Sequence, residues 1–413
     1  MTAVVFYFQI HQPFRLRRFT AAEVGQGLEW FDAAENARIL QRVATKCYLP
    51  MTELLLRLIA KHGGEFRCAF SISGTALDQM EAWSPACIAS FQALAATGCV
   101  EFLTETSHHS LAALFDPAEF DLQVGNHTAR IEKLCGRRPT TFRNTELVVD
   151  NRIARRAEDL GFTAILGEGA DRLLGWRSPR LVYRPGTCER IKLLLRSYSL
   201  ADDIAFRFSN RGWSEWPLTA EKWAGWLHEV PEPNGVVNLF MDFETFGEHQ
   251  WADSGIFQFM EQLPAAVLSD KKFTFRTPAQ IAAELEAVES LDIPKPVSWA
   301  DTERDLTAWL GNQMQRTASE CLYHKLAQLR ALGRKQPKLL ESWRRLSTSD
   351  HLYYMCTKWF ADGDVHKYFS PYQSPHEAFV VFMNVLDDFA LRMAEAAAPG
   401  ARKPVAKKAQ RTN

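Results

Sequence analysis

The chain has 413 residues, a formal net charge of −1, 46% hydrophobic residues and 23% charged residues. This composition is typical of a globular protein with a large core, and a net charge near zero gives no general attraction to nucleic acid or to an anionic membrane. No uninterrupted apolar stretch is long enough to span a bilayer, and residues 1–14 lack the basic region and cleavage site of a signal peptide.

The eight cysteines are scattered along the chain, and none forms a C-x-x-C pair. Their spacing argues against a structural zinc site or a redox dithiol, so we expect free, mostly buried thiols in a cytoplasmic protein. Aromatic residues make up 12% of the chain, with 12 Trp and 27 Phe. Aromatic side chains fill cores, and they also line sugar-binding clefts because a pyranose ring presents an apolar face. The composition is compatible with both roles.

Seven short runs rich in β-branched and aromatic residues predict buried strands. They are residues 3–10, 66–73, 100–105, 140–146, 163–168, 191–199 and 236–243. Helix-like stretches lie between most of them, including residues 48–64, 84–98 and 152–162, which each contain a glycine stop signal. Strands and helices that alternate this often predict parallel β-α units, and about seven strands favour a barrel over an open sheet.

The pattern changes at residues 291–299, where two prolines indicate a linker. Long helical stretches follow at residues 302–329, 337–359 and 374–398, and they predict a helical bundle packed on the barrel. We therefore expect a catalytic barrel at residues 1–290, a C-terminal helical domain at residues 291–397 and a disordered basic tail at residues 398–413.

Polar residues follow every predicted strand. In chain order they are Gln9, His11 and Gln12; Ser73; Glu105, His108 and His109; Asn144 and Glu146; Glu168; Asp202 and Asp203; and Asp242 and Glu244. The carboxyl ends of the strands in a β/α barrel meet on one face, where active sites lie. A single such residue is commonly a turn or helix cap, but a series of seven predicts an active site.

At least three carboxylates should share this face: Glu146, Asp242 and Glu244. Two carboxylates that flank a bond are typical of glycoside hydrolysis, where one is a nucleophile or base and the other is an acid with a raised pKa. Asp242 and Glu244 are two residues apart, so on a strand they point the same way, and we expect only one of them to be the acid. A neighbouring negative charge and burial against aromatic residues would raise its pKa.

Four segments, in this order, resemble the signature regions of glycoside hydrolase family 57: FQIHQPFR, EFLTETSHHSLAALF, FRNTEL and FMDFETFGEHQW. SWADTERDLTAWLGNQMQ and CTKWFADGDVHKYFSPYQSP resemble the helical region of its compact amylase-type members, so the resemblance covers nearly the whole chain except the basic tail. It implies an α/β fold, an incomplete (β/α)7 TIM-like barrel followed by a C-terminal α-helical bundle. It also implies a retaining mechanism that needs no metal or other cofactor.

The resemblance implies that Glu146 is the nucleophile and Asp242 the acid/base, with carboxyl groups roughly 5–5.5 Å apart. It also places His11 beside the sugar in the catalytic subsite and Glu244 beside the acid. Further candidates for substrate binding are Gln12, one of His108 and His109, Asp203, Asp301 with Arg304, and Trp213, Trp216, Trp251 and Trp299.

Alternatives stay open for several of these candidates. Core packing is an equal alternative for each tryptophan, and helix capping is an equal alternative for Asp203. Asp301 and Arg304 could simply pair with each other. Glu248, close to Glu244 in the chain, is expected in a loop or at the start of a helix.

The resemblance implies an α-1,4-glucan or maltooligosaccharide substrate and an α-amylase or 4-α-glucanotransferase type of activity. Glycogen branching is an alternative, although the chain lacks the insertions of longer branching enzymes and the β-sandwich of large glucanotransferases. A metal-dependent carbohydrate deacetylase or mannosidase would need His and Asp in ligand geometry, and His11 forms no H-x-H pair. A catalytically weak glucan-binding protein is a third alternative, and intact Glu146 and Asp242 argue against it. No oligomeric state is predicted.

Overall fold

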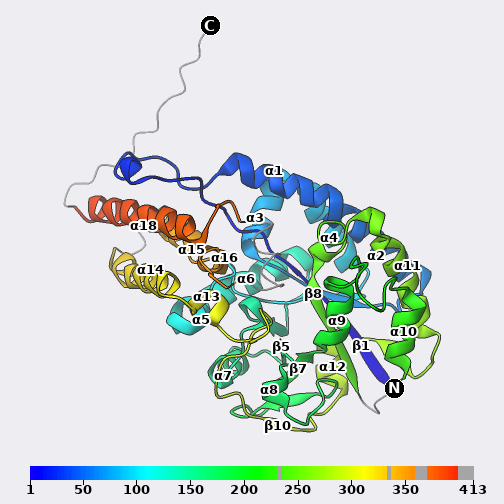
Figure 1. Ribbon diagram of the computed structural model, residues 1–413. Helices are drawn as coiled ribbons and strands as arrows, with labels where there is room; N and C mark the ends of the chain where they lie inside the picture. The colour runs from blue at the N-terminus through cyan, green and yellow to red at the C-terminus, as the bar shows by residue number, and fades with distance from the viewer. Residues whose placement is uncertain (230–234, 333–335, 359–369, 399–413) are drawn as a thin grey trace.

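The computed structural model describes residues 1–229, 235–332, 336–358 and 370–398 of the chain. Figure 1 shows a barrel of strands surrounded by helices, with a further group of helices at one side. Each of the seven predicted strands is confirmed, and together they form the barrel. They are β1 (Thr2–Ile10), β2 (Cys68–Ile72), β3 (Val100–Phe102), β4 (Thr141–Arg143), β5 (Ala164–Glu168), β7 (Lys192–Arg196) and β8 (Val236–Asp242).

The barrel closes through parallel pairing of neighbouring strands. β1 pairs with β2 and with β8, β2 pairs with β3, β4 pairs with β5, and β5 pairs with β7. A bridge between Thr104, just beyond β3, and Phe142 of β4 joins the two halves. β7 and β8 meet through the pair Arg196 and Asn238, which makes this seam short. The arrangement agrees with the predicted incomplete (β/α)7 barrel.

Three further strands were not predicted: β6 (Tyr183–Pro185), β9 (Phe273–Phe275) and β10 (Glu289–Leu291). β6 pairs antiparallel with β7 and parallel with β10, and β9 pairs with the first residues of β1. Each has three residues.

The continuous apolar run of β1 is explained by burial on both faces of the strand. Alternate residues of a strand point to opposite sides. Tyr7 therefore packs inside the barrel, with its ring 5.4 Å from that of Phe240 on β8. Phe8 points outward and contacts the rings of Phe70 and Phe243 in the layer between strands and helices.

The helices that connect the barrel strands include the three predicted ones, which correspond to α2, α4 and α7. In chain order the connecting helices are α1 (Ala33–Val43), α2 (Leu49–Lys61), α3 (Gly74–Trp83), α4 (Pro85–Ala96), α5 (Ala112–Phe115), α6 (Pro117–Cys135), α7 (Asn151–Asp159), α8 (Asp171–Leu174), α9 (Tyr198–Ala205) and α10 (Ala220–His228). After β8 come α11 (Ile256–Leu268) and α12 (Pro278–Glu284), one on each side of β9 in the chain.

The C-terminal region is helical as predicted, but two of the three long stretches are broken. Its helices are α13 (Thr307–Leu310), α14 (Gln313–Ala331), α15 (Pro337–Leu346), α16 (Ser349–Tyr353) and α18 (Pro375–Ala397). α14 starts afresh because the side chain of Asn312 accepts a hydrogen bond from the backbone N–H of Gln315 at 3.0 Å. Residues 359–369, and the predicted disordered tail from residue 399 onward, lie outside the described residues.

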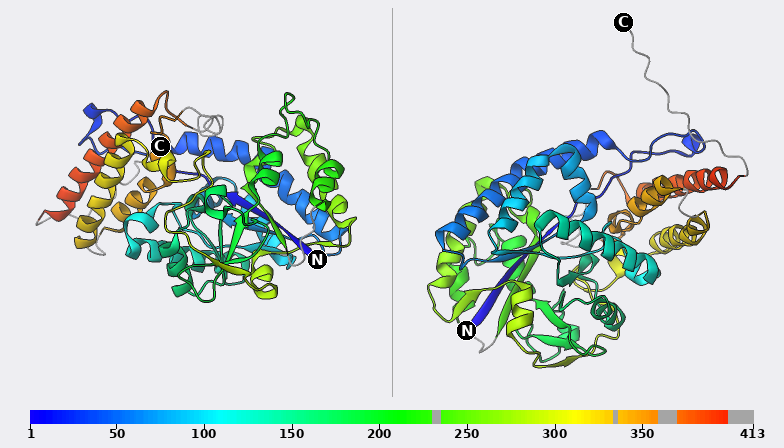
Figure 2. Two further views of the ribbon diagram at one scale, coloured as in Figure 1. Left: turned by 60° about the horizontal axis from the view of Figure 1, so that its bottom comes forward. Right: turned by 180° about the vertical axis from the view of Figure 1, so that it is seen from behind.

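An N-terminal segment also packs into this helical region. Leu16, Phe19 and Trp30 are buried in the same apolar cluster as Phe389 of α18. The indole N–H of Trp30 donates a hydrogen bond to Asp388 at 2.8 Å. Figure 2 shows this blue segment, which leads into α1, beside the red α18. The helical region therefore packs against an N-terminal segment as well as following the barrel in the chain.

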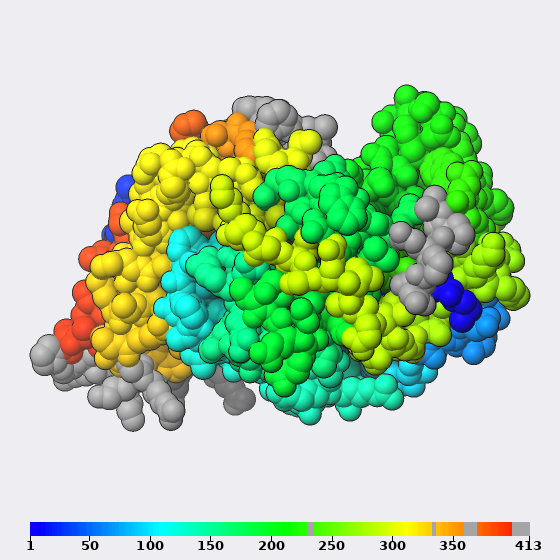
Figure 3. All heavy atoms as spheres, turned by 90° about the horizontal axis from the view of Figure 1, so that it is seen from below, coloured from blue at the N-terminus to red at the C-terminus, as the bar shows by residue number. Residues whose placement is uncertain are grey.

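Figure 3 shows the barrel and the helical region in broad contact. The green segment that includes α10 projects from the barrel on the side opposite the helical region. None of the described helices combines the length and the hydropathy that crossing a membrane requires.

The rings that pack around Phe70 provide a test of the layer between strands and helices. Four ring centroids lie 5.0–5.7 Å from that of Phe70, namely those of Phe8, Phe91, Phe102 and Phe243. Phe70→Ala should lower the free energy of unfolding by about 3–5 kcal/mol, because the cavity that it leaves is closed in on all sides. Urea-induced unfolding measures this loss. Val380→Ala, at an exposed position of α18, is the control and should change stability by less than about 0.5 kcal/mol.

Candidate active site

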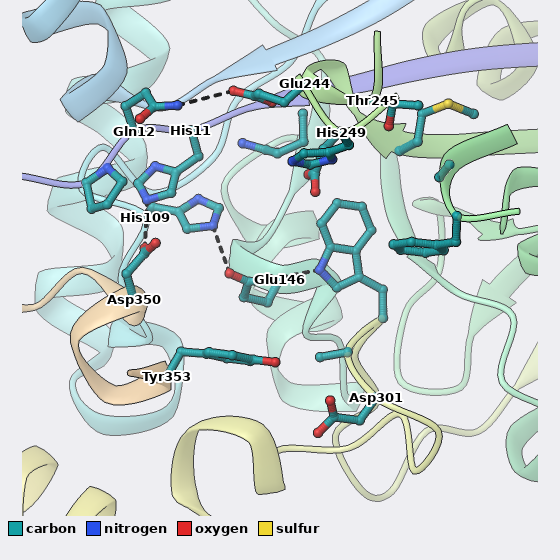
Figure 4. A pocket seen from close by; sticks show the side chains of 18 of the residues that line it. His11, Gln12, His109, Glu146, Glu244, Thr245, His249, Asp301, Asp350 and Tyr353 are labelled. Atoms are coloured by element: carbon teal, nitrogen blue, oxygen red, sulfur yellow. Dashed lines mark hydrogen bonds and ion pairs between the residues drawn. The ribbon is translucent and has the colours of Figure 1, made fainter. Parts of the chain in front are cut away.

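A cavity lies where the barrel strands end, and the helical region covers part of it. Figure 4 shows His11, His109 and Glu146 from the barrel side facing Asp350 and Tyr353 of α16. Residues that are more than 200 positions apart in the sequence therefore share one cavity.

A ring of polar side chains, one from the carboxyl end of each barrel strand, lies at and behind the bottom of this cavity, and three of them line it. In order around the barrel they are Gln9, Ser71, Glu105, Arg143, Glu168, Arg196 and Asp242. All of them except Asp242 are buried. From Glu105 to Asp242 the formal charges alternate in sign, so each charge has opposite charges as neighbours. This arrangement reduces the penalty of burying ionised groups.

Glu146 follows β4 in a single turn of 3-10 helix and is held by three hydrogen-bond donors. His109 Nε2 and Ser349 Oγ donate to its Oε1 at 3.2 and 3.3 Å, and Trp299 Nε1 donates to its Oε2 at 2.8 Å. Burial alone would raise the pKa of Glu146, but the hydrogen bonds and the charge of His109, with the charge of Arg143, lower it to about 2. The carboxylate is thus anionic and fixed in orientation.

His109 lies between two carboxylates. Its Nδ1 donates to Glu105 Oε2 at 2.6 Å while its Nε2 donates to Glu146. Burial alone would lower the pKa of His109, but Glu105 and Glu146 raise it to about 9. Both ring nitrogens therefore carry hydrogen, and His109 is an imidazolium.

His11 stacks on His109 with ring centroids 4.0 Å apart and an interplanar angle of 17°. Its Nε2 donates to Asp350 at 2.8 Å, and its Nδ1 accepts from the hydroxyl of Ser73 at 2.7 Å. Burial and the charge of His109 lower the pKa of His11. One ring of the stack is therefore neutral and the other is charged, which avoids the repulsion of two stacked cations.

Asp242 and Glu244 have carboxyl groups that favour the protonated form. Burial and the charge of Glu146 raise the pKa of Asp242 to about 6. Burial and the charge of Asp242 raise the pKa of Glu244 to about 8, and the hydroxyl of Tyr48 donates a hydrogen bond to Glu244. Gln12 lies next to Glu244, with its Nε2 3.5 Å from Oε1. The site therefore combines one carboxylate with a lowered pKa and two carboxyl groups with raised pKa values, about 6 for Asp242 and about 8 for Glu244.

Backbone strain is concentrated at this cavity. Among the described residues, five non-glycine residues have φ between 50° and 57°: His109, Glu146, Leu147, Asp301 and Arg304. Four of them line the cavity, and Leu147 is adjacent to Glu146. The left-handed conformation costs about 1 kcal/mol or more for such residues, so the surrounding contacts must hold them there.

Charged residues also line the side of the cavity next to Trp299, namely Arg196, Asp202 and Arg304. Arg196 pairs with Glu168 at 3.3 Å and with Asp202, and Arg304 pairs with Glu168 at 3.0 Å. Asp301 also lines the cavity and lies 3.7 Å from Lys358, so Asp301 and Arg304 have different partners rather than each other.

Of the predicted site residues, nine line the cavity: His11, Gln12, His109, Glu146, Asp242, Glu244, Trp299, Asp301 and Arg304. His108 does not, because its ring turns to Glu341 at 3.3 Å, so the choice between the two histidines falls on His109. Asp203 does not either, because it pairs with Arg207 one helical turn later, and Asp202 lines the cavity instead.

Three of the predicted tryptophans also lie outside the cavity. Trp213 is partly buried against Trp226, with ring centroids 6.1 Å apart. Trp216 and Trp251 are 43% and 58% exposed. Glu248, expected in a loop or at a helix start, lies in the turn after β8, where it is buried and pairs with Arg42 at 2.6 Å.

The sequence reading missed the contribution of α16 and its neighbours. Asp350, Tyr353 and Tyr354 line the cavity, and Ser349 contacts Glu146 directly. An acid in the first turn of a helix is commonly explained by the helix dipole, so Asp350 gave no specific signal. His249 also lines the cavity. Its position in the motif FMDFETFGEHQW could have identified it as a candidate site residue.

Within the described part of the chain, no group of three or more His, Cys, Asp and Glu residues has the arrangement needed to hold a metal ion. The cavity's polar groups are instead engaged with one another, as the contacts above show.

Comparison with known proteins agrees with the sequence motifs. A family model described as "Glycosyl hydrolase family 57" matches residues 5–294. A curated protein of Methanocaldococcus jannaschii, described as "Putative alpha-amylase", is 39% identical over 400 residues, which cover 94% of this chain and 84% of that protein.

Solved structures share the fold at low sequence identity. A branching enzyme from Pyrococcus horikoshii described as GH57-type has a TM-score of 0.71 and 15% identity, over 96% of this chain and 90% of that chain. A 4-alpha-glucanotransferase from Thermococcus litoralis has a TM-score of 0.65 and 14% identity, and the chain spans 56% of its length. The family resemblance in the sequence is confirmed, and the chain belongs to glycosyl hydrolase family 57.

Proposed function

We propose that the protein is a retaining enzyme that acts on α-1,4-glucans through a covalent glycosyl-enzyme intermediate, of the α-amylase or 4-α-glucanotransferase type. The observation that carries this proposal is that two carboxyl groups in one cavity have pKa values shifted in opposite directions. Glu146 is ionised, with a pKa of about 2, while Asp242 has a pKa of about 6. A retaining glycosidase needs this pair.

In the first step, the Glu146 carboxylate attacks the anomeric carbon while Asp242 gives its proton to the departing glycosidic oxygen. The bond from the anomeric carbon to the leaving sugar breaks as the bond to a Glu146 oxygen forms. The donors His109, Ser349 and Trp299 hold the carboxylate in a fixed orientation, which reduces the reorganisation needed for attack.

In the second step, Asp242 must accept a proton from the attacking water or sugar hydroxyl. The electrostatics of the site favour this change of role. Formation of the ester removes the negative charge of Glu146, which is one cause of the raised pKa of Asp242. The pKa of Asp242 therefore falls in the intermediate, and the same group becomes a base.

An exposed aromatic lip lies beside the cavity and consists of Phe206 and Trp251. Phe206 is 47% exposed and lines the cavity, while Trp251 is 58% exposed outside it. Gln250, next to Trp251, joins the two parts of the lip because its side chain bonds Ala205 and Ser209. We propose that the lip binds the glucan chain where it leaves the cavity, since aromatic faces stack on pyranose rings.

Product analysis with maltoheptaose tests the activity itself. Shorter sugars alone indicate hydrolysis, additional longer sugars indicate 4-α-transfer, and new α-1,6 links indicate branching. Wild-type protein that leaves maltoheptaose unchanged at every pH between 5 and 8 would contradict the proposal.

The two carboxyl groups should respond differently to substitution. Glu146→Gln should reduce kcat on maltoheptaose by more than about 1,000-fold, because an amide is no nucleophile. Asp242→Asn should reduce it by about 100- to 10,000-fold. With α-maltosyl fluoride, whose leaving group needs no proton, Asp242→Asn should recover much of the rate of fluoride release in the first turnover, before the second step needs a base, and Glu146→Gln should recover none. Equal rates of fluoride release by the two variants would reject the role assignment.

The pH dependence of the rate should follow the two pKa values. Asp242 must be protonated in the first step, so kcat/KM should fall by about tenfold per pH unit as the pH rises above about 6. Glu146 must be ionised, and it stays so until the pH approaches about 2. Initial rates on maltoheptaose across the pH range measure both limbs. A profile that is level between pH 6 and 9 would contradict Asp242 as the acid.

The aromatic lip should matter for long substrates only. Trp251→Ala should lower kcat/KM on amylose by about five- to tenfold, which corresponds to about 1–1.4 kcal/mol of lost apolar burial. The rate on α-maltosyl fluoride should change little, because this short donor ends inside the cavity. Trp176→Ala is the matched control, since Trp176 is 85% exposed but lies on a loop that pairs with β10 through Arg177 and Glu289. The lip is not a binding site if both variants treat amylose alike.

A further inference from the structure

Glu105 lies behind the cavity rather than in it. Its side chain is fully buried below His109, and it is absent from the cavity lining. Oε2 accepts the hydrogen bond from His109 Nδ1 at 2.6 Å, while Oε1 accepts from Ser71 Oγ at 2.5 Å and from Gln9 Nε2 at 2.9 Å. Three donors therefore hold a carboxylate that cannot reach the substrate.

The three groups Glu105, His109 and Glu146 form a continuous hydrogen-bonded chain. Since each ring nitrogen of His109 faces a carboxylate oxygen, each must donate. A neutral imidazole has one N–H and could serve only one of the two carboxylates. The geometry thus requires the imidazolium form, and Glu105 supplies the second negative charge that makes this form stable in a buried position.

We propose that Glu105 is a positioning residue for the nucleophile, which acts through His109 by keeping this ring in the doubly protonated form that orients Glu146. The proposal rests on the proposed function, because it takes Glu146 as the attacking group. It assigns a role to a residue that neither touches the substrate nor follows from the two-carboxylate mechanism.

The charge balance explains why a carboxylate is needed at this position. The transition state of glycoside cleavage develops positive charge at the anomeric carbon, so a net negative charge on the nucleophile side stabilises it. An imidazolium paired with Glu146 alone would cancel that charge. With Glu105 present, the three groups carry a net charge of −1, and after esterification of Glu146 the remaining pair is neutral.

Other titratable groups also face His109, and they shift its proton equilibrium less directly. His11 stacks on one face of the ring and is neutral, and Asp350 lies beyond His11 at 2.8 Å from its Nε2. Arg143 acts on both Glu105 and Glu146 by its charge. Removal of Glu105 leaves Glu146 as the one acid that bonds His109 directly, so the pKa of His109 should fall.

Glu105→Gln tests the proposal with little change of shape. The rate of fluoride release from α-maltosyl fluoride isolates the attack by Glu146, because this substrate needs no acid. We expect kcat to fall by about 100-fold with KM nearly unchanged, because the nucleophile loses its fixed orientation. The loss should grow as the pH rises from 6 to 9, since His109 then loses its proton in the variant but keeps it in the wild-type protein.

NMR titration of histidine labelled with ¹⁵N measures the same charge state without turnover. In Glu105→Gln the His109 resonance should titrate at a lower pH than in the wild-type protein. His109→Gln is the second variant, and it should reproduce the lower kcat but without the added loss between pH 6 and 9. His108→Gln is the matched control, because His108 is the neighbouring residue but pairs with Glu341 outside the cavity.

An unchanged His109 titration in Glu105→Gln would overturn the proposal, and so would a loss of rate that is equal at every pH. Wild-type protein without activity on maltoheptaose or α-maltosyl fluoride would instead reject the proposed function. In that case the titration still decides whether Glu105 sets the charge of His109.

Discussion

The charges buried where the barrel strands end must balance within the protein, because bulk water does not reach most of them. A closed parallel barrel brings seven strand ends together, and here each brings a polar side chain to one layer. An isolated buried charge would cost several kcal/mol, so the layer is stable only if opposite charges alternate. The order Glu105, Arg143, Glu168, Arg196 and Asp242 meets this condition, and the cavity chemistry is built on it.

The helical region completes this balance rather than simply covering the barrel. Asp350 of α16 bonds His11, and Ser349 bonds Glu146, so the first and fourth polar strand ends are each held from across the interface. Trp299, on the segment that leads from the barrel to the helices, bonds Glu146 and lies 4.9 Å from the Arg143 guanidinium. A movement of the helices would therefore change the hydrogen bonds of the catalytic carboxylate. Loss of the barrel-helix interface should affect the site before it affects the barrel core.

Much of the fold was predictable, because long buried strands and acids at their ends leave a clear local pattern. β1 and β8 are continuous apolar runs, and Asp242 follows one of them directly. The contribution of Asp350 was not predictable by this route, since it lies 339 residues from its partner His11 and its local sequence resembles an ordinary helix start. The exposure of Trp251 was likewise not predictable, because an aromatic residue in a sequence is compatible with both a core and a surface position.

Glu146 and Asp242 differ in role, as nucleophile and acid, because their neighbours differ; both side chains carry the same carboxyl group. Both are carboxyl groups at strand ends, and burial raises the pKa of both. Glu146 has an imidazolium and an indole N–H as donors, which outweigh burial and keep it ionised. Asp242 is buried and lies beside that ionised group, so burial and the neighbouring anion both raise its pKa. The same network that makes Glu146 a nucleophile therefore makes Asp242 an acid, and removal of a donor to Glu146 should alter both roles at once.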